Sequence, residues 1–255
     1  MNIFILKLIL APLIIGSASL AGRKWGPAVS GWIVGLPLTS GPVVFFLALS
    51  HDTTFATNAT LGVISGGISL VLYSLSYVWL ANRFRWQVSI IGSLMVFTAC
   101  TAILQNFTFP LRPMFFIVCV AILAALRLIP NDIVEETDAQ PGVWDIPLRI
   151  LIGTSFILLI TGIAPFIGPH LTGLLTTIPL YVSILTVFAH RHQGSAAAAH
   201  VLRGLLYGLF AFAGFFLTLN LLLERTGIAV AFISAIMVAL AVQGTSLWWL
   251  HQPHS

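Results

Sequence analysis

The chain has 255 residues, of which 58% are hydrophobic and 7% are charged, and its mean hydropathy is +1.04. Soluble domains carry roughly 25% Asp, Glu, Lys and Arg, so the 11 basic and 7 acidic side chains of this chain are too few to cover a water-soluble surface. Composition therefore excludes soluble enzymes, nucleic-acid-binding proteins and disordered regulators, and it predicts an integral membrane protein.

Apolar segments of the length of a membrane span recur along the whole chain. A spanning helix needs about 20 apolar residues to cross about 30 Å of hydrocarbon. Nine segments qualify, approximately 3–21, 28–50, 60–82, 87–105, 111–129, 146–165, 170–189, 200–222 and 227–247. The fifth is short, with Pro113 near its start, and the eighth begins in the polar-flanked stretch 196–203, so eight or ten spans remain possible. The fold class that follows is an all-α polytopic membrane protein.

Positive charge predicts the orientation of the spans. With the N-terminus outside, eight of the 11 basic residues fall on the cytoplasmic side, in agreement with the positive-inside rule. These eight are Arg23, Lys24, Arg83, Arg85, Arg127, Arg149, Arg191 and Arg203. Six of the seven tryptophans fall at the same span ends, where indole rings favour the interface. We therefore expect a plasma-membrane or inner-membrane protein with an external N-terminus and a cytoplasmic C-terminus.

The first predicted span, 3–21, has a second interpretation as a cleaved signal peptide. Its end, Ser17-Ala-Ser-Leu-Ala21, matches the small-residue pattern of a cleavage site. However, Lys7 is its only basic residue, and Arg23 and Lys24 directly after the site would resist translocation. We expect the segment to be retained as a span.

The second span contains six residues that interrupt a helix or add polar groups to it: Gly35, Pro37, Thr39, Ser40, Gly41 and Pro42. The prolines lack the amide hydrogen that a helix interior needs, and each collides with the preceding turn. The glycines permit backbone angles that other residues avoid. We expect a helix that ends near Leu36, an irregular bridge, and a second helix that begins with Ser40 as N-cap and Pro42 near its first position.

An aqueous connection follows the fifth span. It contains five of the seven acidic residues, namely Asp132, Glu135, Glu136, Asp138 and Asp145. A site of paired carboxylates is one interpretation, but a solvated linker fits the charge and the length better. We predict a first repeat at 1–129 with spans one to five, an acidic cytoplasmic linker at 130–145, and a second repeat at 146–255 with spans six to nine.

A shift of 142 residues aligns punctuating residues of the two halves. It pairs Gly26 with Gly168, Pro27 with Pro169, Gly31 with Gly173, Pro37 with Pro179 and Gly66 with Gly208. Five spans separate the two Gly-Pro turns, an odd number, so the repeats would be inverted in the membrane. Many secondary transporters have inverted repeats and hold their substrate near the midplane. The alternative is two unrelated helical hairpins that both begin at a Gly-Pro turn.

The seventh span carries polar residues at the place that matches the interrupted second span, with milder breakage: Thr176, Thr177, Pro179, Tyr181 and Ser183. Backbone groups released by a break must face protein, water or a ligand, because hydrocarbon cannot solvate them. The start of a half-helix also presents free N–H groups and a partial positive charge, which suit a carboxylate or phosphate. We predict that these residues and the six of the second span bind a small solute.

Packing alone offers another interpretation of both kinked spans. Glycines four residues apart allow close helix contact, as at Gly31 and Gly35 or at Gly204 and Gly208. Serine and threonine hydroxyls can repair a kink without any ligand. Under this interpretation the kinks have no binding function.

Reactive and metal-ligating side chains are scarce inside the predicted spans. No Asp or Glu lies well inside any of them, because Asp52 and Glu224 fall at outer span ends. Arg203, near the inner end of the eighth span, either extends to the interface or pairs with an anion in a cavity. We therefore predict no catalytic residue, no metal site, no cofactor and no nucleic-acid partner, and the lipid bilayer as the surrounding medium.

These features favour a small secondary transporter or exporter-like permease with a midplane site at the broken second helix. A channel or pore subunit and a non-catalytic membrane scaffold are the alternatives. An enzyme is not expected, since it needs converging acid, base or nucleophilic groups.

Overall fold

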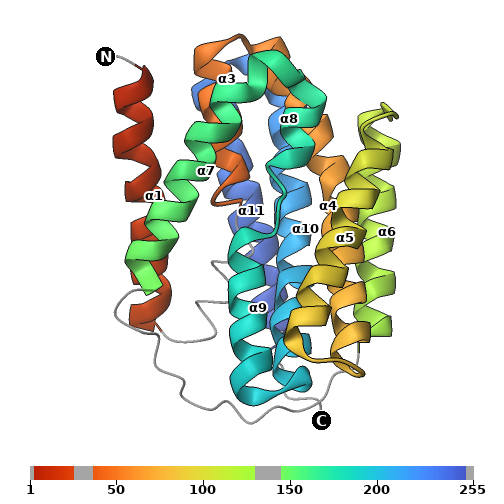
Figure 1. Cartoon of the computed structure of the whole chain (residues 1–255). Helices are drawn as coiled ribbons and strands as arrows, with labels where there is room; N and C mark the ends of the chain where they lie inside the picture. The colour runs from red at the N-terminus through yellow and green to blue at the C-terminus, as the bar shows by residue number, and fades with distance from the viewer. Residues whose placement is uncertain (1–2, 26–36, 130–144, 251–255) are drawn as a thin grey trace.

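The computed structural model describes residues 3–25, 37–129 and 145–250, and every regular element in these ranges is a helix (Figure 1). The helices are α1 (Ile3–Trp25), α3 (Ser40–Ser50), α4 (Thr53–Ala81), α5 (Trp86–Leu104), α6 (Leu111–Leu128), α7 (Asp145–Ile167), α8 (Pro169–Leu175), α9 (Leu180–Gln193), α10 (Ser195–Thr226) and α11 (Ile228–Leu250). The all-α prediction is confirmed for the described part of the chain.

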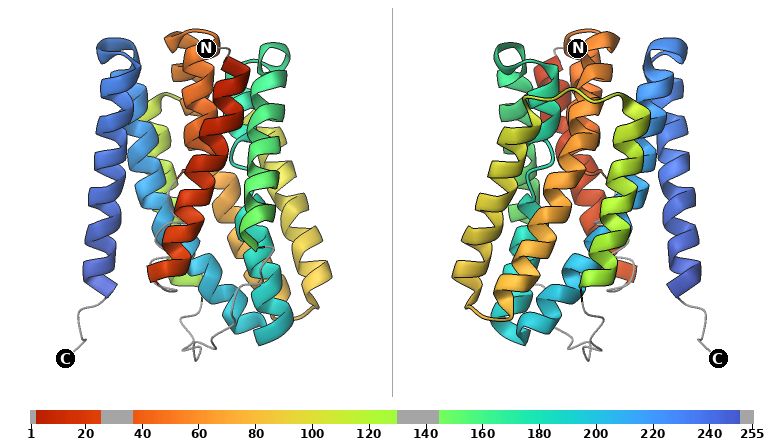
Figure 2. Two further views of the ribbon diagram at one scale, coloured as in Figure 1. Left: turned by 90° about the vertical axis from the view of Figure 1, so that its left-hand side faces the viewer. Right: turned by 90° about the vertical axis from the view of Figure 1, so that its right-hand side faces the viewer.

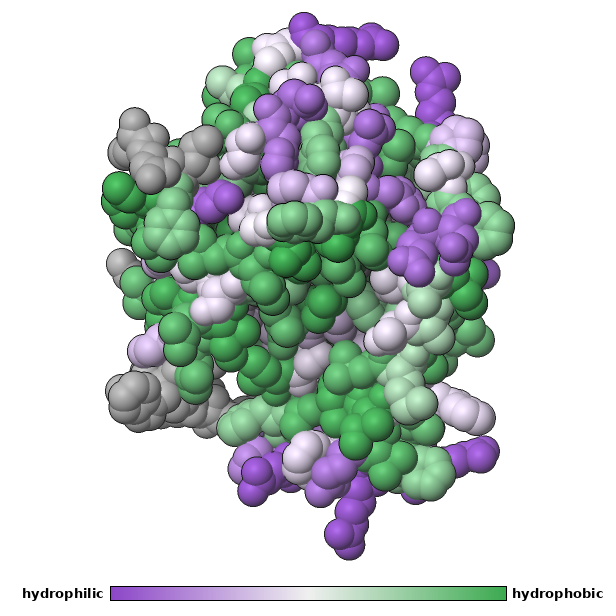
Figure 3. All heavy atoms as spheres, turned by 45° about the horizontal axis from the view of Figure 1, so that its top comes forward, coloured by the Kyte–Doolittle hydropathy of each residue, from purple (hydrophilic) through white to green (hydrophobic). Residues whose placement is uncertain are grey.

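Seven helical segments within the described ranges are long and apolar enough to cross a membrane, with α8 and α9 together forming one of them. Two shorter apolar helices, Phe4–Ser17 and Ser40–Ser50, come from α1 and α3. On the face drawn in Figure 3, hydrophilic side chains gather at the two ends and a hydrophobic band lies between them. These features support the predicted membrane protein. The start of the predicted second span, 28–36, lies outside the described residues.

Two helices begin earlier than the sequence predicted. Helix α4 begins at Thr53 rather than near 60, because Asp52 caps it: its Oδ1 accepts a hydrogen bond of 2.5 Å from the Phe55 amide. Helix α10 begins at Ser195 rather than near 200, directly after Gly194, whose φ of 94° ends α9. The intervening alanines are buried, so the stretch that reads as polar-flanked is a packed helical turn.

Helices α4 and α10 form the centre of the bundle. Helix α4 packs against α3, α5, α6, α8 and α10, and α10 packs against α4, α6, α9 and α11. In the apolar window of α4, 72% of residues are buried, against 22% in α5 and in α6, which are therefore peripheral. Helices α1 and α7 pack against each other at one side of the bundle (Figures 1 and 2).

The helices of the two halves have the same spacing along the chain. The shift of 142 residues carries the bounds of α1 onto those of α7, and the first residues of α4 and α5 onto those of α10 and α11. In each of these pairs the two helices run in opposite directions (Figure 1). Helix α6 matches no other described helix under this shift. Equal spacing and opposite direction are features that an inverted repeat predicts.

Arginines mark one end of the bundle, which we call the basic end. It is the lower end in Figure 1, at which α4, α6 and α9 finish. Six arginines lie at or near it, namely Arg83, Arg85, Arg127, Arg149, Arg191 and Arg203. The described residues thus place on one side the arginines that the sequence assigned to the cytoplasm. That this side faces the cytoplasm stays a prediction.

Arg203 of α10 is held by the end of α6. Its Nη1 donates to the carbonyl oxygens of Leu126 at 2.9 Å and of Ile129 at 2.6 Å, and its Nη2 lies 3.5 Å from the Tyr207 hydroxyl. The last carbonyls of a helix have no partner within the helix, so the guanidinium caps α6. The side chain therefore joins two helices instead of ending in an aqueous interface or on an anion.

Replacing Arg203 should weaken the contact between α6 and α10. We expect Arg203→Gln to lower the free energy of unfolding by about 1.5–3 kcal/mol, the range for hydrogen bonds to charged groups, as measured by thermal unfolding in detergent micelles. Arg191→Gln is the matched control, because Arg191 is exposed at the same end of the bundle. Equal stability of the two variants would contradict the capping role.

Candidate functional site

The first interrupted helix restarts at Ser40, as predicted. The Gly41 amide donates to the Pro37 carbonyl at 2.8 Å, and the Val43 amide donates to the Thr39 carbonyl at 3.1 Å. The N-cap is Thr39 rather than Ser40, which makes Pro42 the third helical residue. Early amides of a helix have no intrahelical partner, so Pro42 costs the helix no hydrogen bond there. Gly35 and the predicted helix end near Leu36 lie outside the described residues.

The second interruption separates α8 from α9 completely, and is not the milder breakage that the sequence suggested. Thr176 Oγ1 donates to the Gly173 carbonyl at 2.7 Å, and Thr177 Oγ1 donates to the Leu174 carbonyl at 2.7 Å. These bonds satisfy carbonyl oxygens at the end of α8. Pro179 has no amide hydrogen and becomes the N-cap of α9. Two threonine hydroxyls and one proline together allow the helix to end and restart.

The break between α8 and α9 lies at the middle of the bundle. A Cβ atom on Gly66 would overlap the Thr177 side chain, and Gly66 is adjacent to the central residue of the 29-residue α4. One turn away, a Cβ on Gly62 would overlap the His170 carbonyl, and a Cβ on Gly173 would overlap the Ala59 carbonyl. Helices α4 and α8 therefore meet backbone to backbone, a contact that small residues permit.

The glycine pairs chosen from the sequence do not include this contact. Gly31 and Gly35 lie outside the described residues, and Gly204 is exposed, with no atom within 4 Å of an added Cβ. The signal that could have identified the contact is the pair Gly62 and Gly66, which has the same four-residue spacing. Spacing alone cannot tell which of several glycine pairs faces another helix.

Hydroxyl groups of α4 and α9 face each other below the break. The Tyr73 hydroxyl and Ser183 Oγ are 2.9 Å apart, and the Tyr77 hydroxyl lies 3.3 Å from His190 Nδ1. Both tyrosines are fully buried. Tyr181, in the first turn of α9, donates instead to the Arg149 carbonyl of α7 at 2.8 Å. Sequence reasoning did not include Tyr73 and Tyr77 in the site, although their spacing of four residues places them on one helix face.

Around α3 the contacts are aromatic. The Phe215 ring of α10 lies 3.7 Å from the position of a Cβ on Gly41, and Phe45 packs edge-on against Phe232 of α11 with ring centroids 5.2 Å apart. The shift of 142 residues carries Tyr73 and Ser183 onto Phe215 and Gly41. Each restarted helix is therefore contacted by an aromatic residue at the same position, and only the α9 side has hydroxyl groups.

The predicted site residues thus fall into two groups. The first, from Pro37 to Pro42, lies at the start of α3 beside α10, and the second, from Thr176 to Ser183, lies around the start of α9 beside α4 and α7. Within 37–129 and 145–250 no hydrogen bond joins the two groups directly. The same ranges contain no group of three or more His, Cys, Asp or Glu side chains that could hold a metal ion.

No family model matches the chain, and no curated protein or solved structure is significantly similar to it. The function must therefore be inferred from the geometry of the two interrupted helices.

Adding a methyl group at Gly66 should disturb the break. We expect Gly66→Ala to lower the free energy of unfolding by about 1–3 kcal/mol, because the new Cβ overlaps Thr177 in a packed region. Thermal unfolding in nanodiscs measures the change. The control, Gly162→Ala, has open space around its Cβ and should stabilise α7 by about 0.5–1 kcal/mol. Combining Gly66→Ala with Thr177→Ala should recover part of the loss, and no recovery would argue against this contact.

Proposed function

We propose that this chain is a small permease, which moves a solute across the membrane through a site beside its interrupted helices. The observation that carries the proposal is the break between α8 and α9, whose Thr177 packs against Gly66 at the middle of α4. A break at that depth is tolerated where the backbone faces protein or a water-filled cavity, but not where it faces lipid. Broken helices at the midplane form the substrate sites of many transporters.

Two buried hydroxyls near this break have no hydrogen-bond partner in the described protein. Thr186 Oγ1 belongs to α9, and Thr154 Oγ1 belongs to α7, where it directly follows Gly153, the neighbour of Tyr181. Thr186 is fully buried and lies three residues after Ser183, so it shares the helix face that Ser183 presents to α4. Buried hydroxyls are normally hydrogen-bonded. A polar solute with its water would supply partners for both.

The matched halves support a mechanism of alternating access. Helices α1 and α7, α4 and α10, and α5 and α11 have corresponding bounds and opposite directions, which is the arrangement of an inverted repeat. Two such halves have two packings of similar energy, related by exchange of their roles, so that a site between them opens to each side of the membrane in turn. This repeat and its nine spans are part of the proposal.

The charges within the spans favour an anionic solute. Lys7 of α1 and Arg149 of α7 are related by the same shift of 142 residues. Helices α1 and α7 meet where Ile15 lies against Gly153. At 1.5 Å per residue, Lys7 is about 12 Å from this level and Arg149 is about 6 Å from it, towards opposite ends of the bundle. One cation thus lies on each route to the midplane, and intramembrane charges commonly mark substrate pathways.

Solute flux in proteoliposomes tests the permease. Concentration jumps of acetate, phosphate and citrate are applied to protein on a solid-supported membrane, and the transient currents are recorded. Ser40→Ala, Pro42→Ala and Tyr73→Phe should each lower the current for the transported anion about tenfold, equivalent to about 1.4 kcal/mol, without loss of membrane insertion. Thr98→Ala, on the exposed face of α5, is the control and should retain full current. Equal currents in all four variants would contradict the site assignment, and unitary conductance steps in planar bilayers would favour a pore.

The role of Lys7 can be separated from that of the break. We expect Lys7→Gln to raise the concentration of anion needed for half-maximal current and Lys7→Arg to restore it, because the arginine keeps the positive charge. Arg112→Gln removes an exposed charge from the same end of the bundle and should have no effect. Unchanged half-saturation in Lys7→Gln would refute the anionic selectivity while leaving the permease intact.

A further inference from the structure

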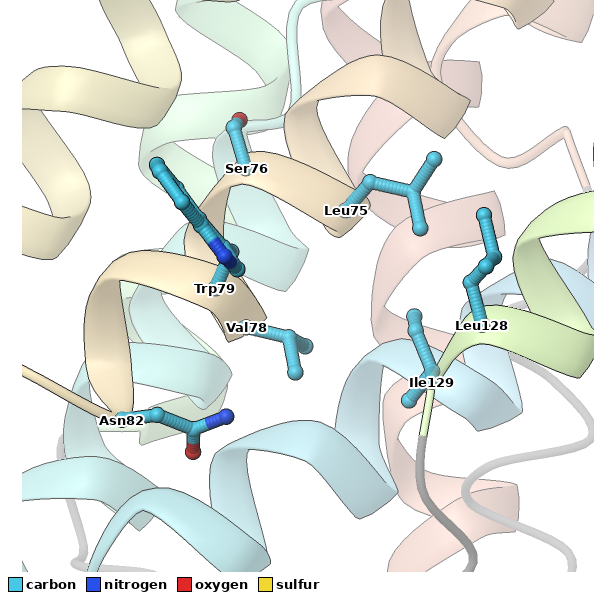
Figure 4. A pocket seen from close by; sticks show the side chains of 7 residues that line it. All are labelled: Leu75, Ser76, Val78, Trp79, Asn82, Leu128 and Ile129. Carbon is cyan, nitrogen blue, oxygen red and sulfur yellow. The ribbon is translucent and has the colours of Figure 1, made fainter.

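A groove of about 460 Å³ opens on the side of the bundle at the basic end, between α4 and the end of α6 (Figure 4). It is lined by Leu75, Ser76, Val78, Trp79, Asn82, Leu128 and Ile129. Its volume lies within the range of about 300–1,000 Å³ that small-molecule sites occupy. The lining is apolar except for one hydroxyl and one amide. The groove is separate from both interrupted helices.

The shape of the groove follows from the contact that Arg203 makes below it. The guanidinium binds the Leu126 and Ile129 carbonyls, and Ile129 is buried against the bundle. Leu128 has the opposite environment and is 70% exposed. The end of α6 is thus fixed beside α4 by its backbone, while its side chain at Leu128 and the exposed ring of Trp79 form two walls that the described protein does not cover.

Cationic groups form the rim of the groove. The Arg83 guanidinium lies 5.2 Å from the centroid of the Trp79 ring, which fixes one cation at the edge of the apolar surface. Arg127, in the last turn of α6, is exposed next to Leu128. The Asn82 side chain points into the space between the two helices (Figure 4). The rim therefore combines two positive charges with an amide donor.

We propose that this groove binds an anionic phospholipid of the leaflet at the basic end, with an acyl chain along Leu75, Val78 and Leu128 and the phosphate between Arg83 and Arg127. From Leu75 to Asn82 the groove extends about 10 Å along α4, at 1.5 Å per residue. This covers about two thirds of one leaflet, since the whole hydrocarbon core is about 30 Å thick. Tryptophan at its polar end is typical of the membrane interface.

The chemistry of the groove favours a lipid over a soluble ligand or a peptide. Its apolar walls are accessible from the hydrocarbon that surrounds the spans, so an acyl chain enters without crossing water. Its charges are all at one end, which matches a molecule with one anionic head and a long apolar tail. Basic residues at the membrane surface attract anionic lipids by about 1 kcal/mol each. The proposal is independent of the permease and needs no solute.

Retention of lipid by the purified full-length protein tests the proposal. Nanodiscs are prepared with phosphatidylcholine alone or with added phosphatidylglycerol, and bound lipid is counted by native mass spectrometry after transfer to detergent. We expect the wild-type protein to retain phosphatidylglycerol in preference to phosphatidylcholine. Arg83→Gln and Arg127→Gln should each weaken this preference about fivefold. Arg112→Gln removes an exposed arginine from the other end of α6 and should leave the preference unchanged.

Further arms separate the lipid from its parts. Free glycerol phosphate should neither compete for the site nor raise the unfolding temperature, because it has no acyl chain. Trp79→Ala should shorten retention of both lipids if the ring forms a wall of the groove, with unfolding temperature measured in parallel to confirm folding. Equal retention of both lipids by the wild-type protein, or an equal effect of Arg112→Gln and Arg127→Gln, would overturn the proposal.

Discussion

The structure depends on one constraint, which is that backbone polar groups inside a membrane must find partners within the protein. The interruption between α8 and α9 meets this requirement with two threonine hydroxyls and a proline. Its position is fixed by glycines of α4 that allow a backbone-to-backbone contact. The same constraint acts at the end of α6, where Arg203 binds the terminal carbonyls. Helix ends and their partners thus determine how the spans are arranged.

The two restarted helices are equivalent in place but different in chemistry. Phenyl rings surround α3, and Phe215 of α10 lies against Gly41. Around α9 the corresponding aromatic residue is Tyr73, whose hydroxyl pairs with Ser183. Aromatic contacts are insensitive to the presence of water, whereas hydroxyl contacts can be exchanged for bonds to water or to a solute. For the permease, polar exchange would therefore take place on the α9 side, with α3 as the more rigid partner.

The sequence predicted helix positions well and their contacts poorly. Helices α5 and α6 begin and end within one residue of their predicted spans, because long apolar runs between polar turns have clear limits. The restart at Ser40 was predicted from the prolines and glycines around it. Helix α4 was predicted too short, because its first turns contain threonine, asparagine and alanine that a hydropathy pattern does not separate from a loop. The complete break after α8 was underestimated, since the stabilising threonine bonds depend on local geometry.

By itself the sequence determined the membrane environment, the helical class, the breaking points and the concentration of arginine at one end. These properties follow from composition and from local backbone chemistry, in which each residue acts with its near neighbours. Only the tertiary structure decided that Tyr73 meets Ser183, that Arg203 caps α6, and that Gly66 receives Thr177. In a chain that is apolar almost throughout, many helix faces are equally suited to contact, so hydrophobicity does not specify partners. Shape complementarity between residues far apart in the chain makes that choice.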